Sequence, residues 1–164
     1  MPITPLHFGV LAPINHWLPG KVSNLAFILV NLSLDAVAIQ YWAFGLALPE
    51  HAPGTHSFIG AWENALIMCI LGIRLKKTFW PTYQWILGCF LGATSHVLLD
   101  MLVHPEMLPF YPIEGNPFYM GWMEPLSMAL LPLTIWLIVQ YVSGIRDWVG
   151  NKIARAKARI QVPS

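Results

Sequence analysis

The chain has 164 residues, of which 56% are hydrophobic and only 10% are charged, and its formal net charge is +1. An average soluble domain carries about 25% charged residues, so this chain lacks the polar surface that a water-exposed globule needs. The composition therefore disfavours a soluble enzyme, a disordered tail and a nucleic-acid-binding protein, and it predicts an integral membrane protein.

Apolar segments, taken in chain order, predict where the chain crosses the bilayer. The first, 5–18, is short and is interrupted by Pro13, so it fits a re-entrant helix as well as a full span. A spanning helix needs about 20 mostly apolar residues. The segments of that length are 22–48, 58–75, 82–103 and 125–142. The predicted fold class is an all-α membrane protein, with four long transmembrane helices plus a short N-terminal membrane-embedded helix forming one bundle.

The placement of Lys and Arg predicts the orientation, because cytoplasmic loops retain these residues. They occur at Lys21, in the turn 74–77 and in the tail, whereas 49–54 and 104–122 contain neither. We therefore expect the Lys21 turn, the 74–77 turn and the C-terminus to face the cytoplasm.

The end of the chain differs from the rest in charge. Residues 150–164 are predicted to form a basic, cytoplasmic amphipathic tail that lies on anionic lipid, after a single transmembrane domain over 1–149. The expected localisation is a multi-pass protein of the cytoplasmic (inner) membrane.

Ionisable side chains within the apolar segments are the first candidates for function, because charge is expensive in the hydrocarbon core. They are Asp35, Glu63, His96 and Asp100, with His7, His56 and His104 near segment ends. On 82–103, Gly88 and Gly92 form a GxxxG step that allows a neighbouring helix to approach closely. His96, Asp100 and His104 follow Gly92 at every fourth position, so these three ionisable residues share one helix face. On 22–48, Asn31 and Asp35 also lie on one stripe.

Depth brings these residues into one layer. Counted at about 1.5 Å per residue from the expected cytoplasmic ends, four segments carry a His or carboxylate about 17–27 Å up, in the outer half of the bilayer. This common depth requires the N-terminal segment to begin on the outer side of the membrane. We therefore predict that imidazoles and acids from distant segments surround a cation beneath the outer surface.

The chemistry of this set favours a divalent metal. Imidazole and carboxylate together suit Zn²⁺, Mn²⁺ or Fe²⁺, and the absence of Cys ligands argues against a closed structural zinc site. His96 and Asp100, at i and i+4, can hold an ion from one helix face, and a cation keeps buried carboxylates ionised. One or two ions are expected. The alternative is a His–Asp hydrogen-bond network that packs helices, with Glu63 as a structural acid.

Several short blocks between residues 1 and 131 resemble successive blocks of one known family. The blocks are 4–9 (TPLHFG), 31–35 (NLSLD), 56–61 (HSFIGA), 95–104 (SHVLLDMLVH), 109–110 (PF) and 116–117 (NP). They are similar to the membrane-bound metal-dependent hydrolases, a family related to inner-membrane hydrolases described as LexA-binding. The resemblance implies a small bacterial or archaeal membrane protein.

The resemblance also implies a ligand set and shows one departure. The implied metal ligands are His7, Asp35, His56, His96, Asp100 and His104. Family members often have a second acid two residues after the Asp35 position, where this chain has Val37. Glu63 is not part of the family pattern, so a second metal site that needs this acid would have to use Glu63.

The leading functional hypothesis is a metal-dependent hydrolase acting on an ester or phosphoester. The location suggests a lipid-like substrate, and the Pro- and aromatic-rich loop 105–123 would cap the site. Asp35 and Glu63 are the candidates for a catalytic general base.

Two other function classes remain open. One is a non-catalytic accessory subunit or assembly factor in a larger membrane complex, or a homo-oligomer. The other is a proton or metal conduit, which is disfavoured because the polar groups occupy only one half of the bilayer. Membrane lipid is an expected partner, and nucleic acid is not.

Overall fold

The computed structural model describes residues 4–36, 43–44, 53–75, 82–123, 125, 135–136 and 139. All regular elements within these residues are helices, which confirms the all-α class for this part of the chain. Most of 37–48, all but four residues of the predicted span 125–142, and the basic tail 150–164 lie outside the described residues. The predicted domain boundary at 149/150 lies outside them too.

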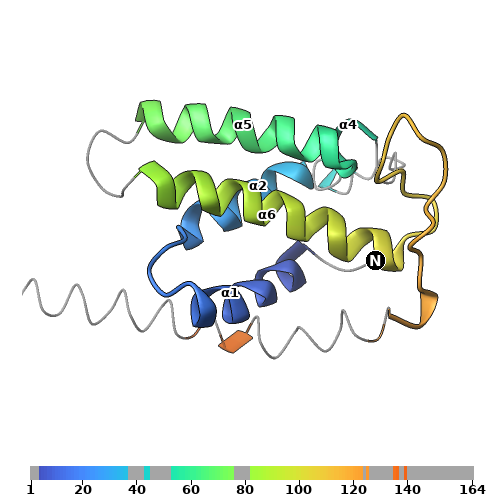
Figure 1. Ribbon diagram of the computed structural model, residues 1–164, viewed down its shortest axis with the longest axis horizontal. Helices are drawn as coiled ribbons and strands as arrows, with labels where there is room; N and C mark the ends of the chain where they lie inside the picture. Colours follow the sequence, from blue (N-terminus) through green and yellow to red (C-terminus); the bar gives the residue numbers. More distant parts are fainter. Residues whose placement is uncertain are drawn as a thin grey trace, which may run out of the picture.

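Two helices are long and apolar enough to cross a membrane by length and composition: α5 (Phe58–Leu75) and α6 (Thr82–Val103). Their bounds match the predicted segments, and the two helices lie side by side (Figure 1). Leu66, Ile67 and Ile70 of α5 are exposed, as expected for side chains that contact lipid. These two helices support membrane association.

The N-terminal part of the chain forms shorter helices than a full span. The segment before Leu18 is helical as predicted, as the 3₁₀ helix η1 (Thr4–Val10) followed by α1 (Leu11–Trp17). Pro13 lies in the first turn of α1, where a missing backbone N–H costs little. Helix α2 (Asn24–Leu34) has only 11 residues, so it is too short to cross a bilayer alone.

Helix α6 packs against both α2 and α5, and glycines set its distance from α2. A Cβ added at Gly88 would lie 2.5 Å from Ser23 O, and one added at Gly92 would lie 2.5 Å from Val30 Cγ1. Any side chain at these positions would push α2 away. The predicted close approach at the GxxxG step is confirmed, and it brings the end of α2 near the middle of α6.

The loop after α6 folds over the same end of the bundle as the short helix α4 (Pro53–His56) (Figure 1). Asn116 Nδ2 donates to the carbonyls of Met101 and His104 at 2.6 and 2.8 Å. Phe58 N–H donates to Pro109 O at 2.9 Å, at the start of α5. The loop, which includes η2 (Gly121–Met123), is therefore fastened to the ends of both long helices.

Candidate metal centre

Five ionisable side chains from four separate elements meet at this end of the bundle. His7 lies on η1, Asp35 directly follows α2, His56 ends α4, and His96 and Asp100 lie one turn apart on α6. The four residues other than Asp35 are buried. The Asp35 side chain keeps 14% of its surface exposed, so it is the most accessible member of the cluster.

The nitrogen and oxygen atoms of this cluster are closely spaced. His96 Nε2 lies 3.3 Å from Asp35 Oδ1 and 3.2 Å from Asp100 Oδ2. His56 Nε2 lies 3.2 Å from Asp35 Oδ1 and 3.9 Å from Asp100 Oδ2. His7 Nε2 lies 3.2 Å from Asp100 Oδ1. The five side chains therefore form one continuous group.

These separations match those between the ligands of a single metal ion. Ligand atoms about 2.0–2.1 Å from a tetrahedral Zn²⁺ are roughly 3.3–3.4 Å apart. Two triads have one donor atom each within 4.8 Å of the others: His7 with Asp35 and His96, and His56 with His96 and Asp100. His96 belongs to both triads, so it is the central donor.

Among the described residues, two buried ring nitrogens have no hydrogen-bond partner. The Nε2 atoms of His7 and His96 are inaccessible to solvent and make no hydrogen bond of acceptable geometry, although carboxylate oxygens lie 3.2–3.3 Å away. An unsatisfied buried polar atom costs about 1–3 kcal/mol. An ion among these atoms would use a ring-nitrogen lone pair and the carboxylate charge, so the residues present fit a divalent metal.

The charge of the cluster also fits a divalent metal. Asp100 is buried, and its ion pairs in the described part of the chain are to His7, His56 and His96. Burying a carboxylate is expensive unless a positive charge compensates it. One divalent cation would neutralise the two carboxylates of Asp35 and Asp100 and leave all three imidazoles neutral.

Polar side chains outside the cluster orient two of its imidazoles. His56 Nδ1 lies 2.8 Å from Thr55 Oγ1, and His96 Nδ1 lies 3.0 Å from Asn31 Oδ1. Such partners direct the Nε2 atom of a metal-binding histidine toward the ion. Sequence reasoning gave Thr55 no role and placed Asn31 beside Asp35, whereas the Asn31 side chain contacts His96. The sequence did contain a sign of this role, because Asn31 is a polar residue one helical turn before Asp35 in a mostly apolar segment.

Two other candidates lie outside this cluster. His104 follows Asp100 by one turn, and its Nδ1 atom lies 3.3 Å from Glu106 Oε1. Glu63 is exposed on α5. The structure therefore brings together five of the six predicted ligands and one of the two predicted general bases, Asp35.

Comparison of the chain with protein-family models, curated proteins and solved structures finds no match. The resemblance to the membrane-bound hydrolases stays a prediction, and the site has to be interpreted from its own geometry.

Proposed function

We propose that this protein is a multi-pass inner-membrane protein of a bacterium or archaeon that binds a divalent metal and hydrolyses an ester or phosphoester. The observation that carries the proposal is the buried group of three imidazoles and two carboxylates, with two Nε2 atoms that lack hydrogen bonds. Zn²⁺, Mn²⁺ and Fe²⁺ all accept this donor set. A bound ion would supply Lewis acidity to polarise the scissile carbonyl or phosphoryl group.

The chain's own residues divide the work of hydrolysis. His56, His96 and Asp100 are buried and serve as fixed holders of the ion. Asp35 is the most accessible member and directly follows a helix end, so it is placed to accept a proton from an incoming water. Glu63, the other predicted general base, is exposed on α5 and lies outside the cluster.

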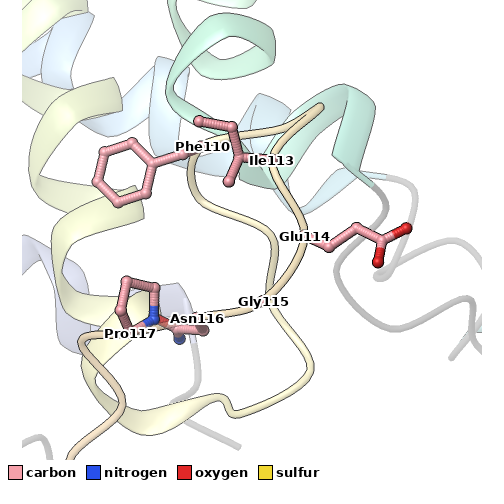
Figure 2. Close-up of a pocket in the computed structure, with 6 residues that line it drawn as sticks. All are labelled: Phe110, Ile113, Glu114, Gly115, Asn116 and Pro117. Atoms are coloured by element: carbon pink, nitrogen blue, oxygen red, sulfur yellow. The ribbon is translucent and has the colours of Figure 1, made fainter.

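A lipid-like substrate is supported by the aromatic surface beside the centre. An open hollow is lined by Phe110, Ile113, Glu114, Gly115, Asn116 and Pro117, and Figure 2 shows Phe110 and Pro117 on opposite sides of it. The Phe110 ring lies 5.7 Å from Phe118 and 5.4 Å from Phe58, which lies 6.1 Å from Trp62 on the next turn of α5. This row of rings runs from the loop onto a membrane-length helix and would accommodate an acyl chain.

Metal binding is tested by measuring the zinc and manganese affinity and the metal content of detergent-purified protein. Wild-type protein is expected to bind one or two ions, and His96→Ala and Asp100→Ala are expected to bind more than about 100-fold more weakly, because each removes a direct ligand. Leu98→Ala is the matched control, since this exposed residue lies between them on the same helix. Full metal retention by both site variants would refute the centre.

Hydrolysis is tested with the zinc- or manganese-loaded protein and chromogenic p-nitrophenyl esters of increasing acyl length, together with bis(p-nitrophenyl) phosphate. Turnover that requires metal in wild type, and that is absent from Asp35→Asn protein loaded with the same metal, supports the proposal. Metal binding without turnover of any ester would favour a different function for the same centre.

That second function is a structural centre in an accessory subunit of a larger membrane complex. It is favoured by one observation: the Nε2 atoms of His56 and His96 each lie 3.2–3.9 Å from carboxylate oxygens of both Asp35 and Asp100, so protein donors could occupy the positions that a substrate would need. Co-purification of a stoichiometric membrane partner, with metal bound but no hydrolysis, would support this alternative.

A further inference from the structure

Asn31 lies at the contact between the metal centre and helix α2. It is fully buried, and its two side-chain atoms face different partners. Nδ2 donates to Phe27 O one turn earlier on α2 at 2.8 Å, and Oδ1 lies 3.0 Å from Nδ1 of His96 on α6. Asn31 therefore connects the α2 backbone to the imidazole that belongs to both donor triads.

The hydrogen-bond partners fix which way the amide of Asn31 points. The carbonyl of Phe27 can only accept a hydrogen bond, so the NH₂ group must face it, and the amide oxygen must face His96. Because that oxygen can only accept, the Nδ1 atom of His96 must carry the proton. A neutral imidazole then has its lone pair on Nε2, the atom that lies between Asp35 and Asp100.

The contact between His96 and His7 is consistent with this assignment. The two Nδ1 atoms lie 2.9 Å apart, and a single proton must be placed between them. Since the amide oxygen of Asn31 requires the proton on His96, the Nδ1 atom of His7 acts as a second acceptor of it. The proton of a neutral His7 then lies on Nε2, which is 3.2 Å from Asp100 Oδ1. The assignment depends only on the fixed amide and the rigid backbone of α2.

We propose that Asn31 is a positioning residue of the metal centre, which holds His96 in the one tautomer and ring orientation that directs Nε2 at the ion. The inference rests on the metal centre of the proposed function. Partners of this kind typically change metal affinity by about 10–100-fold. Burial supports the role, because the Asn31 side chain is inaccessible to solvent and both ends of its amide have a polar partner.

The test compares two substitutions at position 31 with a neighbouring control. Asn31→Leu keeps the approximate volume but removes the acceptor, and we expect about 10–100-fold weaker zinc binding. Asn31→Asp keeps an oxygen facing His96 but replaces the NH₂ group with an oxygen against Phe27 O, so it should lower stability while weakening zinc binding less than Asn31→Leu does. Val30→Ala shortens a buried side chain of the same helix and leaves Asn31 and His96 unchanged, so it reports general loosening of α2.

A purely structural role for Asn31 would give a different pattern. If Asn31→Leu and Val30→Ala lower zinc affinity equally, or if Asn31→Asp binds as weakly as Asn31→Leu, the positioning role is wrong. Unfolding temperatures of the metal-free variants show which of them remain folded.

Nitrogen-15 NMR of histidine-labelled, zinc-loaded protein provides a second measurement. The His96 ring should show a proton on Nδ1 and a metal-bound Nε2, and binding through Nδ1 would overturn the inference. The failures are distinguishable, because absence of zinc binding in wild type refutes the centre itself, whereas equal binding by wild type and Asn31→Leu refutes only the role of Asn31.

Discussion

His96 Nε2 and Asp100 Oδ2 lie 3.2 Å apart on successive turns of α6, and the Nε2 atom has no hydrogen-bond partner in the part of the chain that the structure describes. The pair is fixed by helix geometry, since residues i and i+4 lie on one face. The other donors depend on tertiary structure, because they come from η1, the end of α2 and α4. The centre therefore forms only when these segments pack onto α6, and metal binding should be coupled to folding.

Metal removal should lower the stability of the protein. A ligand that binds only the folded state at about 100 times its dissociation constant stabilises it by about 2.7 kcal/mol. We therefore expect the unfolding temperature in detergent to fall on chelation and to recover when zinc or manganese is added back. Asp100→Asn should show no such recovery. An unfolding temperature that is unchanged by chelator in wild type would contradict the coupling.

Gly92→Ala should weaken metal binding through the spacing of two helices. The added methyl would lie 2.5 Å from Val30 Cγ1 and 2.9 Å from Phe27 O, so α2 must shift and move Asp35 away from His96. Overpacking of this kind costs about 1–3 kcal/mol. Zinc titration and thermal unfolding together measure the two effects.

Gly88→Ala is the matched control for this prediction. It creates a similar clash one turn nearer the start of α6, 2.5 Å from Ser23 O and further from the donors. It should lower stability to a similar extent but reduce zinc affinity less than Gly92→Ala. Equal losses of affinity would show that helix spacing near the donors is not the cause.

Asn116→Ala should release the loop that covers this end of the bundle. Its amide donates to Met101 O and His104 O at 2.6 and 2.8 Å, and each net hydrogen bond contributes about 0.5–1.5 kcal/mol. We expect faster proteolysis within 104–123 and a lower unfolding temperature, with zinc affinity retained, because Asn116 contacts none of the donors. Asn116→Asp, which places oxygen against both carbonyls, should be at least as damaging. Unchanged proteolysis in both variants would show that these bonds do not hold the loop.

Local rules were sufficient to predict the two long helices and the shared face on α6. Hydrophobic length set the bounds of α5 and α6, and i, i+4 spacing placed His96 beside Asp100. The common depth of His7 and His56 followed from counting residues along each segment. The structure places both rings against the His96 ring, with centroid distances of 4.4 Å for His7 and 5.3 Å for His56.

The end of helix α2 and the partners of several polar side chains depend on tertiary packing, so they could not be predicted from the sequence alone. Helix α2 ends at Leu34 although the apolar pattern continues, so Asp35 directly follows a helix end. The partners of Asn31 and Thr55 depend on how separate helices dock, and no periodicity encodes this. Glu63 is seven residues from His56, a spacing that gives a shared face only on one continuous helix. Helix α4 ends at His56 and α5 begins at Phe58, so the helical count does not continue across the break.

Substitution of Glu63 tests the one predicted base that lies outside the cluster. Its side chain is exposed on α5, so Glu63→Gln should leave zinc affinity unchanged within experimental error. Asp35→Asn should weaken zinc binding more than about tenfold, because Asp35 Oδ1 lies 3.2–3.3 Å from two imidazole nitrogens and supplies half of the carboxylate charge. Titration of both variants measures the difference, and ester turnover by the zinc-loaded proteins separates binding from proton transfer. A Glu63→Gln variant that binds zinc normally but loses turnover would establish Glu63 as the base, whereas loss of zinc binding would place it among the ligands and contradict the geometry of the centre.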